Sequence, residues 1–167
     1  GTQGGGVVSN GTFHMTWSRI HHNAAGKDCD LERGFQPPYV DMCMGGGVHI
    51  VGGELLVFKS VIYSNSAVCG DGSNCFAGSN FIPVFGGGIS MLYKGRMRLR
   101  MTSIHSNGAE EGGGIYVAEP WQNYHAHYGD APLDVKIIEC NISGNDAKSL
   151  LRHFTTNQFL RGTLDQF

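Results

Sequence analysis

The chain has 167 residues, the length of one ordinary domain, and its formal net charge of −2 gives no overall attraction to nucleic acid or to an anionic membrane. Glycine occurs 26 times, while charged residues make up only 16% of the chain. So many glycines favour a turn-rich β fold. No apolar run approaches the roughly 20 residues that span a bilayer. We therefore expect no transmembrane segment and, in GTQGGGVVSN, no signal peptide, although one removed earlier would leave the same sequence.

An internal repeat organises the chain. Three glycines followed by Val or Ile begin at Gly4, Gly45, Gly86 and Gly112. Downstream of each triplet comes an isoleucine, two variable positions, an asparagine and a small pair, as in IYSNSA. A fixed repeat of short strands predicts a parallel β-solenoid, in which each coil pairs with the coils above and below it. The repeated asparagines are Asn23, Asn65, Asn107 and Asn145.

Counting backward from each asparagine aligns the units without gaps. The positions ten, eight and three residues before it are apolar, which is the period of strands with one buried face. The positions nine and seven before it point the other way, so they face outward. In stacked coils, equivalent residues lie about 4.8 Å apart. The apolar columns are Phe13, Leu55, Met97 and Val135; Met15, Val57, Leu99 and Ile137; and Ile20, Ile62, Ile104 and Ile142.

The pairing of GG[GA][ILV] with [FI]xxN resembles the repeats of chlamydial polymorphic outer membrane proteins and related right-handed parallel β-helix proteins of the pectin-lyase-like type. The resemblance covers roughly residues 4–147 and is to the repeat type, because this chain has glycine and isoleucine where the family usually has alanine and phenylalanine. It implies an all-β, right-handed parallel β-helix of about four to six coils.

We expect the β-helix to occupy residues 1–147, with loop insertions at about 26–44, 68–85 and 119–133. The last segment, 148–167, breaks the repeat and is expected to be a C-terminal cap or tail. A short helix over residues 146–153 would cap the last coil and protect its open strand edge.

The asparagines are best interpreted as a structural ladder, since asparagine tolerates left-handed backbone angles and its amide can bond the next amide along the stack. The glycine triplets are interpreted as coil corners. A phosphate-binding loop would require a helix after the glycines, but β-branched, alternating residues follow them.

The outward positions carry the candidate partner-binding residues: Leu56, Phe58, Arg98, Arg100 and Ile138. Apolar side chains there need a cover, which is an insertion, the C-terminal tail or another protein. The arginines are either a solvated face or a basic stripe that recruits an anionic partner. Eleven before asparagine, the column of Thr12, Glu54, Arg96 and Asp134 predicts a salt-bridge ladder centred on Arg96.

The cysteines fall mainly in the insertions. We expect disulfides between Cys29 and Cys43 and between Cys69 and Cys75, in an oxidising compartment; a zinc site made of all four is the alternative. Cys140, in a small buried column, is expected to be a packed free thiol.

Two groups of histidines are candidates for metal binding. In the column two before asparagine, Tyr63 separates His21 from His105, which places these histidines too far apart to share a metal. The alternative metal site is His125, His127 and Asp130 in the last insertion, which is otherwise a polar loop. We expect no metal and no cofactor.

These features predict a non-catalytic β-helix scaffold at a cell surface or in an extracellular structure, with protein or glycan partners contacted through its loops or its outward apolar strip. A structural subunit of a larger assembly, including one in an oxidising organelle lumen, is the alternative. A polysaccharide lyase or hydrolase is a weaker one, because the aspartates lie in loops and no paired-carboxylate centre is evident. No nucleic acid partner is expected.

Overall fold

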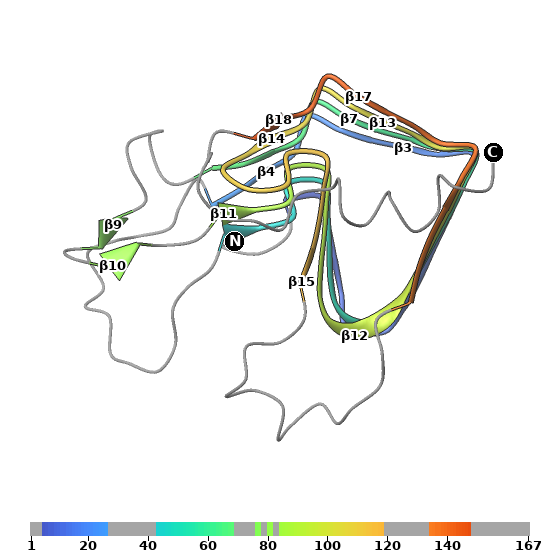
Figure 1. Ribbon diagram of the computed structural model, residues 1–167, viewed down its shortest axis with the longest axis horizontal. Coiled ribbons are helices and arrows are strands. Elements are labelled where there is room, and N and C mark those ends of the chain that lie inside the picture. The colour runs from blue at the N-terminus through green and yellow to red at the C-terminus, as the bar shows by residue number, and fades with distance from the viewer. Residues whose placement is uncertain are drawn as a thin grey trace.

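The computed structural model describes residues 5–26, 43–68, 76–77, 80–81, 84–118 and 134–147. These residues form strands and no helix, and nearly all of the strands pair in parallel (Figure 1). The expectation of an all-β chain with parallel sheets is thereby confirmed. Within the described segments there is no helix long and apolar enough to cross a bilayer. Segment 148–167 and most of the three insertions lie outside the described residues.

The largest sheet contains two long central strands, β6 (Val48–Phe58) and β12 (Ile89–Arg100). Each runs alongside two shorter strands of the neighbouring repeat, and the long strands are strongly curved (Figure 1). The short strands are β1 (Val7–Ser9) and β2 (Thr12–Thr16) beside β6, and β15 (Ile115–Ala118) and β16 (Asp134–Ile138) beside β12.

Two further parallel sheets each take one short strand from every repeat. The first has the order β3, β7, β13, β17 and the second the order β4, β8, β14, β18. A parallel pair, β5 and β11, and an antiparallel pair, β9 and β10, complete the described elements. The bounds are β3 (Arg19–His21), β7 (Val61–Tyr63), β13 (Ser103–His105), β17 (Asn141–Ser143), β4 (Ala24–Ala25), β8 (Ser66–Ala67), β14 (Gly108–Ala109), β18 (Asp146–Ala147), β5 (Cys43–Met44), β11 (Val84–Phe85), β9 (Phe76–Ala77) and β10 (Asn80–Phe81).

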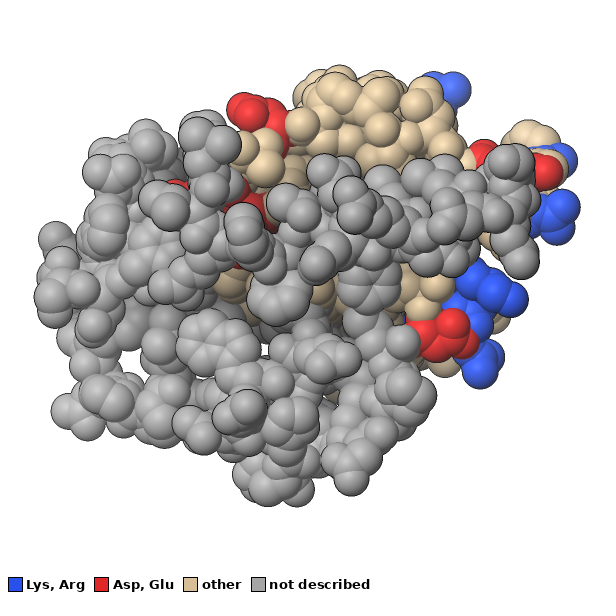
Figure 2. Space-filling model, viewed as in Figure 1, with Lys and Arg blue, Asp and Glu red and all other residues tan. Residues whose placement is uncertain are grey.

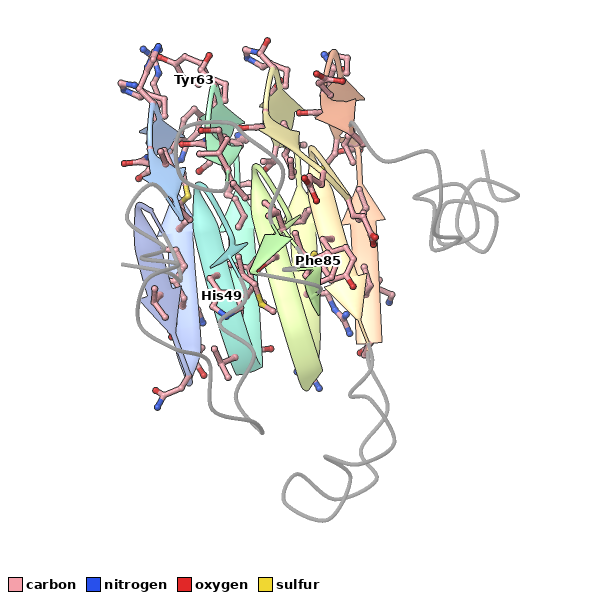
Figure 3. All side chains as sticks on the ribbon, turned by 90° about the vertical axis from the view of Figure 1, so that its left-hand side faces the viewer. His49, Tyr63 and Phe85 are labelled. Carbon is pink, nitrogen blue, oxygen red and sulfur yellow. The ribbon has the colours of Figure 1, made fainter. Side chains whose placement is uncertain are left out.

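We call the stacked repeats rungs 1 to 4; they comprise the described residues of 5–25, 43–67, 84–109 and 111–147. Seen along the stack, equivalent segments nearly superpose (Figure 1), and from the side the rungs lie next to one another in chain order (Figure 3). Leu55 pairs with Phe13 and Met97, and Met97 pairs with Val135. This is the register obtained by counting back from each asparagine, so the predicted columns are confirmed.

Left-handed backbone angles recur at the corners of every rung. One corner follows β2, β6, β12 and β16, where Trp17, Lys59, Met101 and Glu139 have φ between 47° and 53°. Residues other than glycine rarely adopt such angles, so the surrounding ladder must hold the backbone of these four residues in this conformation. The next residue in each rung helps: the hydroxyls of Ser18, Ser60 and Thr102 and the thiol of Cys140 donate to the carbonyl two residues earlier, at 2.8, 2.9, 3.0 and 3.2 Å.

The glycine triplets form another corner. Gly45 has φ of 63°, a conformation that glycine adopts without cost. Gly47 is needed for a different reason, because a Cβ there would lie 2.6 Å from the carbonyl oxygen of Gly88 in the next rung. The triplet therefore combines a turn with a close approach of neighbouring rungs, and a β-strand, not a helix, follows it.

The core lies between the sheets and is built from the inward columns. Leu55, Ile62, Met97 and Ile104 are fully buried, and Phe13 and Val135 in the outer rungs pack against them while remaining partly exposed. Burial is therefore deepest in rungs 2 and 3, which have a described neighbour on both sides.

The prediction of a capping helix over residues 146–153 is wrong for its first two residues. Asp146 and Ala147 form β18 and pair with Gly108 and Ala109. They are the fourth copy of the small pair that follows each asparagine, so the ladder continues through them. Residues 148–153 lie outside the described residues.

Candidate binding surface

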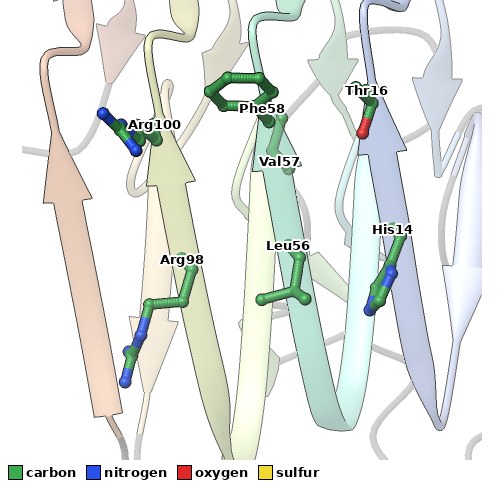
Figure 4. A pocket seen from close by; sticks show the side chains of 7 residues that line it. All are labelled: His14, Thr16, Leu56, Val57, Phe58, Arg98 and Arg100. Atoms are coloured by element: carbon green, nitrogen blue, oxygen red, sulfur yellow. The ribbon is translucent and has the colours of Figure 1, made fainter.

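The outward side chains of β2, β6 and β12 line a groove of about 290 Å³ on the largest sheet. Because the strands are in register, rungs 1, 2 and 3 each contribute their outward positions nine and seven before the asparagine, and Val57 of an inward column also borders the groove (Figure 4). The lining residues are His14, Thr16, Leu56, Val57, Phe58, Arg98 and Arg100.

The middle of the groove is apolar and its sides are polar or basic. Leu56 and Phe58 from rung 2 lie between His14 and Thr16 of rung 1 and the two arginines of rung 3 (Figure 4). Both apolar side chains are only half-buried. In rung 4 the same strip continues with Ile138, which is 38% exposed. The structure therefore brings together the five residues expected to meet a partner.

Ion pairs cross the rungs beside this strip. Arg96 lies between Glu54, at 3.1 Å, and Asp134, at 3.7 Å, as the register predicts. Arg98 also bonds the Asp134 carboxylate and, at 3.0 Å, its main-chain carbonyl. The hydrogen bond from Arg98 lowers the pKa of Asp134 below its usual value, with smaller contributions from the charges of Arg98, Arg96 and Lys136. Figure 2 shows basic and acidic side chains close together along one edge of the molecule.

Aromatic and basic side chains meet at the end of the groove. Lys59 lies 4.6 Å from the ring centre of Trp17 and 5.2 Å from that of Phe58. Arg100 lies 6.0 Å from the Phe58 ring and 3.8 Å from the Glu139 carboxylate. Trp17 remains 72% exposed. This corner therefore offers an exposed indole and two cations whose described contacts are weak and solvated.

The repeated asparagines lie in one column at the corner before β4, β8, β14 and β18. The side-chain oxygen of Asn107 accepts from both the main-chain N–H and the amide of Asn65, each at 3.0 Å. The same two bonds join Asn23 to Asn65 and Asn107 to Asn145. Asn65 and Asn107 are 1% exposed. Their bonding capacity is used within the stack, which leaves it unavailable to a ligand.

Several expected sites lie outside the described residues. Cys29, Cys69 and Cys75 are among them, and of Cys43 only the backbone is described. The metal alternative of His125, His127 and Asp130 also lies there. The described part of the chain contains one free thiol, Cys140, whose pKa is raised by burial. It also contains no group of three or more His, Cys, Asp or Glu side chains able to hold a metal.

A stack of aromatic rings occupies the outer side of β3, β7 and β13. Tyr63 stacks between His21 and His105, with ring centres 4.9 and 5.2 Å apart. His22 adds an edge-on contact, and its Nδ1 lies 2.8 Å from Nδ1 of His21. The column of His21, Tyr63 and His105 follows from the repeat, whereas His22 does not, because it lies outside that column at a residue with a left-handed φ of 56°.

A second group that the sequence analysis missed lies on the outer side of β6, β12 and β15. His49 is fully buried, and its Nδ1 lies 2.5 Å from the Ser90 hydroxyl (Figure 3 labels His49). Burial lowers the pKa of His49 to about 4, so the ring is neutral at pH 7. Next to it, Tyr116 stacks on Phe85 with ring centres 4.2 Å apart, and burial raises the pKa of Tyr116. The polar residues His49 and Ser90, each two positions after a glycine triplet, were its only sequence signal.

Comparisons with models of protein families, with curated proteins and with solved structures found no match to this chain.

Proposed function

We propose that the chain is a non-catalytic binding scaffold built as a right-handed parallel β-helix, similar to the pectin-lyase-like repeat proteins. In this proposal the four rungs are a rigid support, and their outward strip contacts a protein or glycan partner. Parallel pairing in one register, corners repeated on every rung and the asparagine column all support a helical stack.

One observation carries the binding role. Leu56 and Phe58 form a half-exposed apolar floor between basic and polar side chains, over a strand that is paired on both sides. Apolar side chains gathered in a hollow with a polar rim are typical of interaction sites. The neighbouring exposure of Trp17 and Ile138 extends this surface along the rungs.

We further propose that the scaffold works outside the cell, at a surface or in an extracellular structure, or in an oxidising organelle lumen. This proposal rests on the cysteine pairs of the first two insertions, since local disulfides are stable in such compartments. Mass spectrometry of the protein purified without reductant tests it. After digestion, the expected result is one disulfide-linked peptide product from each of the first two insertions. Free thiols at all four cysteines would contradict the proposed compartment.

Arrays of acidic, basic and neutral peptides and of glycans test the binding role. The double variant Leu56→Ser/Phe58→Ser should lose the array ligands that the wild-type protein retains. A matched double variant, Val8→Ser/Tyr63→Ser, removes an exposed apolar and an aromatic side chain from other outward positions and should retain them. If wild type retains no array ligand, or if both variants lose binding equally, the binding role is wrong.

A further inference from the structure

Building on the proposed binding function, we infer that the groove takes an acidic segment of a partner protein, with an apolar side chain over Leu56 and a carboxylate on Arg100. The groove volume of about 290 Å³ is at the lower end of the range for ligand sites, so it accommodates one or two side chains and not a whole small ligand. A short peptide segment of this chemistry matches both its size and its lining.

The charge of the lining argues for an acidic partner. The lining contains Arg98, Arg100 and His14 and no carboxylate. Lys59 adds a cation at the end of the groove, within 5.2 Å of the Phe58 ring. The described carboxylates beside these two arginines are already paired, Asp134 with Arg98 and Glu139 with Arg100. An approaching carboxylate is therefore attracted to the groove, and a cationic segment is repelled.

Arg98 and Arg100 differ in how fully described partners engage their guanidinium groups. Arg98 donates to the Met97 carbonyl and to two oxygens of Asp134, which holds its guanidinium in place. Arg100 has an ion pair with Glu139 at 3.8 Å, beyond hydrogen-bond distance, and its side chain is 57% exposed. Its planar donor group is thus able to bond a carboxylate, and Arg100 is the residue on which the partner's charge depends.

The apolar floor favours a peptide over a sugar. A sugar ring needs many hydrogen-bonding groups or an open aromatic face, whereas Leu56 has no polar atom and the main chain of β6 is bonded to β2 and β12. Lys59 and Arg100 both lie near the Phe58 ring, so cations already contact its aromatic surface. A leucine or phenylalanine side chain needs only the aliphatic contact that Leu56 provides.

Fluorescence anisotropy with the peptide acetyl-Glu-Leu-Glu-Phe-Glu-amide, labelled with fluorescein, tests the inference. Wild-type protein should bind this peptide, bind the Gln-substituted peptide less and the Lys-substituted peptide least, and the preference should shrink as salt rises. Arg100→Gln should weaken binding of the acidic peptide roughly fivefold, the effect of removing one exposed charge pair. Arg19→Gln, an equal change on the exposed side of β3, should leave binding unchanged.

A charge swap makes the assignment to Arg100 specific. Arg100→Glu should reverse the order and bind the Lys-substituted peptide better than the acidic one. Leu56→Ser/Phe58→Ser should abolish binding of every peptide. Circular dichroism and a thermal melt of each variant establish that it is folded, and only folded variants are compared.

Three results would overturn the inference. If an oligomer of uronic acid binds the groove and the acidic peptide does not, the occupant is a glycan and the proposed function stands. If the acidic peptide binds the double groove variant as well as wild type, the site lies elsewhere. If neither the peptide nor any array ligand binds wild type, the inference and the proposed function are both wrong.

Discussion

The asparagine column and the outward column nine residues before it lie on the same four rungs and behave in opposite ways. The first repeats one residue with one set of hydrogen bonds. The second has a different side chain on every rung, because these side chains face solvent and share no common set of hydrogen bonds. The uniform column therefore stabilises the fold, and the variable column gives the outward surface its particular chemistry. That variable column is His14, Leu56, Arg98 and Lys136.

Breaking the uniform column should have the largest effect. In Asn107→Ala the main-chain N–H and the amide of Asn65 lose their acceptor, and the Ile62 carbonyl loses its donor. Because these groups are buried, we expect the free energy of unfolding to fall by about 4 kcal/mol. Urea denaturation followed by circular dichroism measures this change.

Asn141→Ala is the matched control, since Asn141 is exposed and contributes its backbone to the ladder. It should change the unfolding free energy by less than about 0.5 kcal/mol. Equal effects of the two substitutions would show that the column does not carry the stability assigned to it.

Acid should destabilise the fold through the buried side chain of His49. Burial lowers the pKa of His49 from 6.5 to about 4, so between these pH values the unfolded chain takes up a proton that the folded chain excludes. Stability is therefore complete above pH 6.5 and falls as the pH drops toward 4, by about 3 kcal/mol from this residue. Below that pH the loss levels off. Urea midpoints measured from pH 7.5 down to 4 record the slope.

His49→Gln removes the titration and keeps a side chain able to bond Ser90, so it should flatten that slope. Leu56→Gln, which changes a groove residue without a titratable group, should leave it unchanged. An unaltered slope in His49→Gln would mean that other groups cause the acid sensitivity.

The column of small residues at the corner after β2, β6, β12 and β16 should have a smaller effect on stability than Asn107 or His49. The hydroxyl of Ser60 donates to the Phe58 carbonyl and accepts from the main-chain N–H of Ser18. Ser60→Ala should lower the unfolding free energy by about 1 kcal/mol. Ser60→Thr should restore it, since Thr102 makes the same donor bond at this position in the next rung. A melt in which the threonine variant is as unstable as the alanine variant would contradict this role.

Much of the fold follows from the repeat because each residue's neighbours along the stack are its own equivalents. Counting back from the asparagines gives the pairing of Met15 with Val57 and of Leu99 with Ile137, and it places Arg96 between two carboxylates. The predicted cap is wrong at Asp146 because this residue belongs to the fourth small pair, which the repeat pairs with Gly108 and Ala109 of the preceding rung.

What the repeat does not predict depends on contacts outside it. His49 and Ser90 are on an outward face and would be expected to meet water, yet both are fully buried. The orientation of His22 depends on a backbone angle that no apolar pattern reports. The groove itself was predicted only as a strip, because whether Arg98 or Arg100 is engaged depends on where a neighbouring carboxylate lies.

The outward column should tolerate change, which gives the smallest effect. Lys136 is exposed in rung 4, in the column where rung 2 has Leu56, so Lys136→Leu should change the unfolding free energy by less than about 0.5 kcal/mol. Ile137, the next residue, faces the core, and Ile137→Ala should lower it by about 2 kcal/mol. Urea denaturation of both variants compares neighbouring positions on opposite faces of one strand. If Lys136→Leu were as destabilising as Ile137→Ala, the outward column would be part of the fold, and its variation from rung to rung would say nothing about a partner.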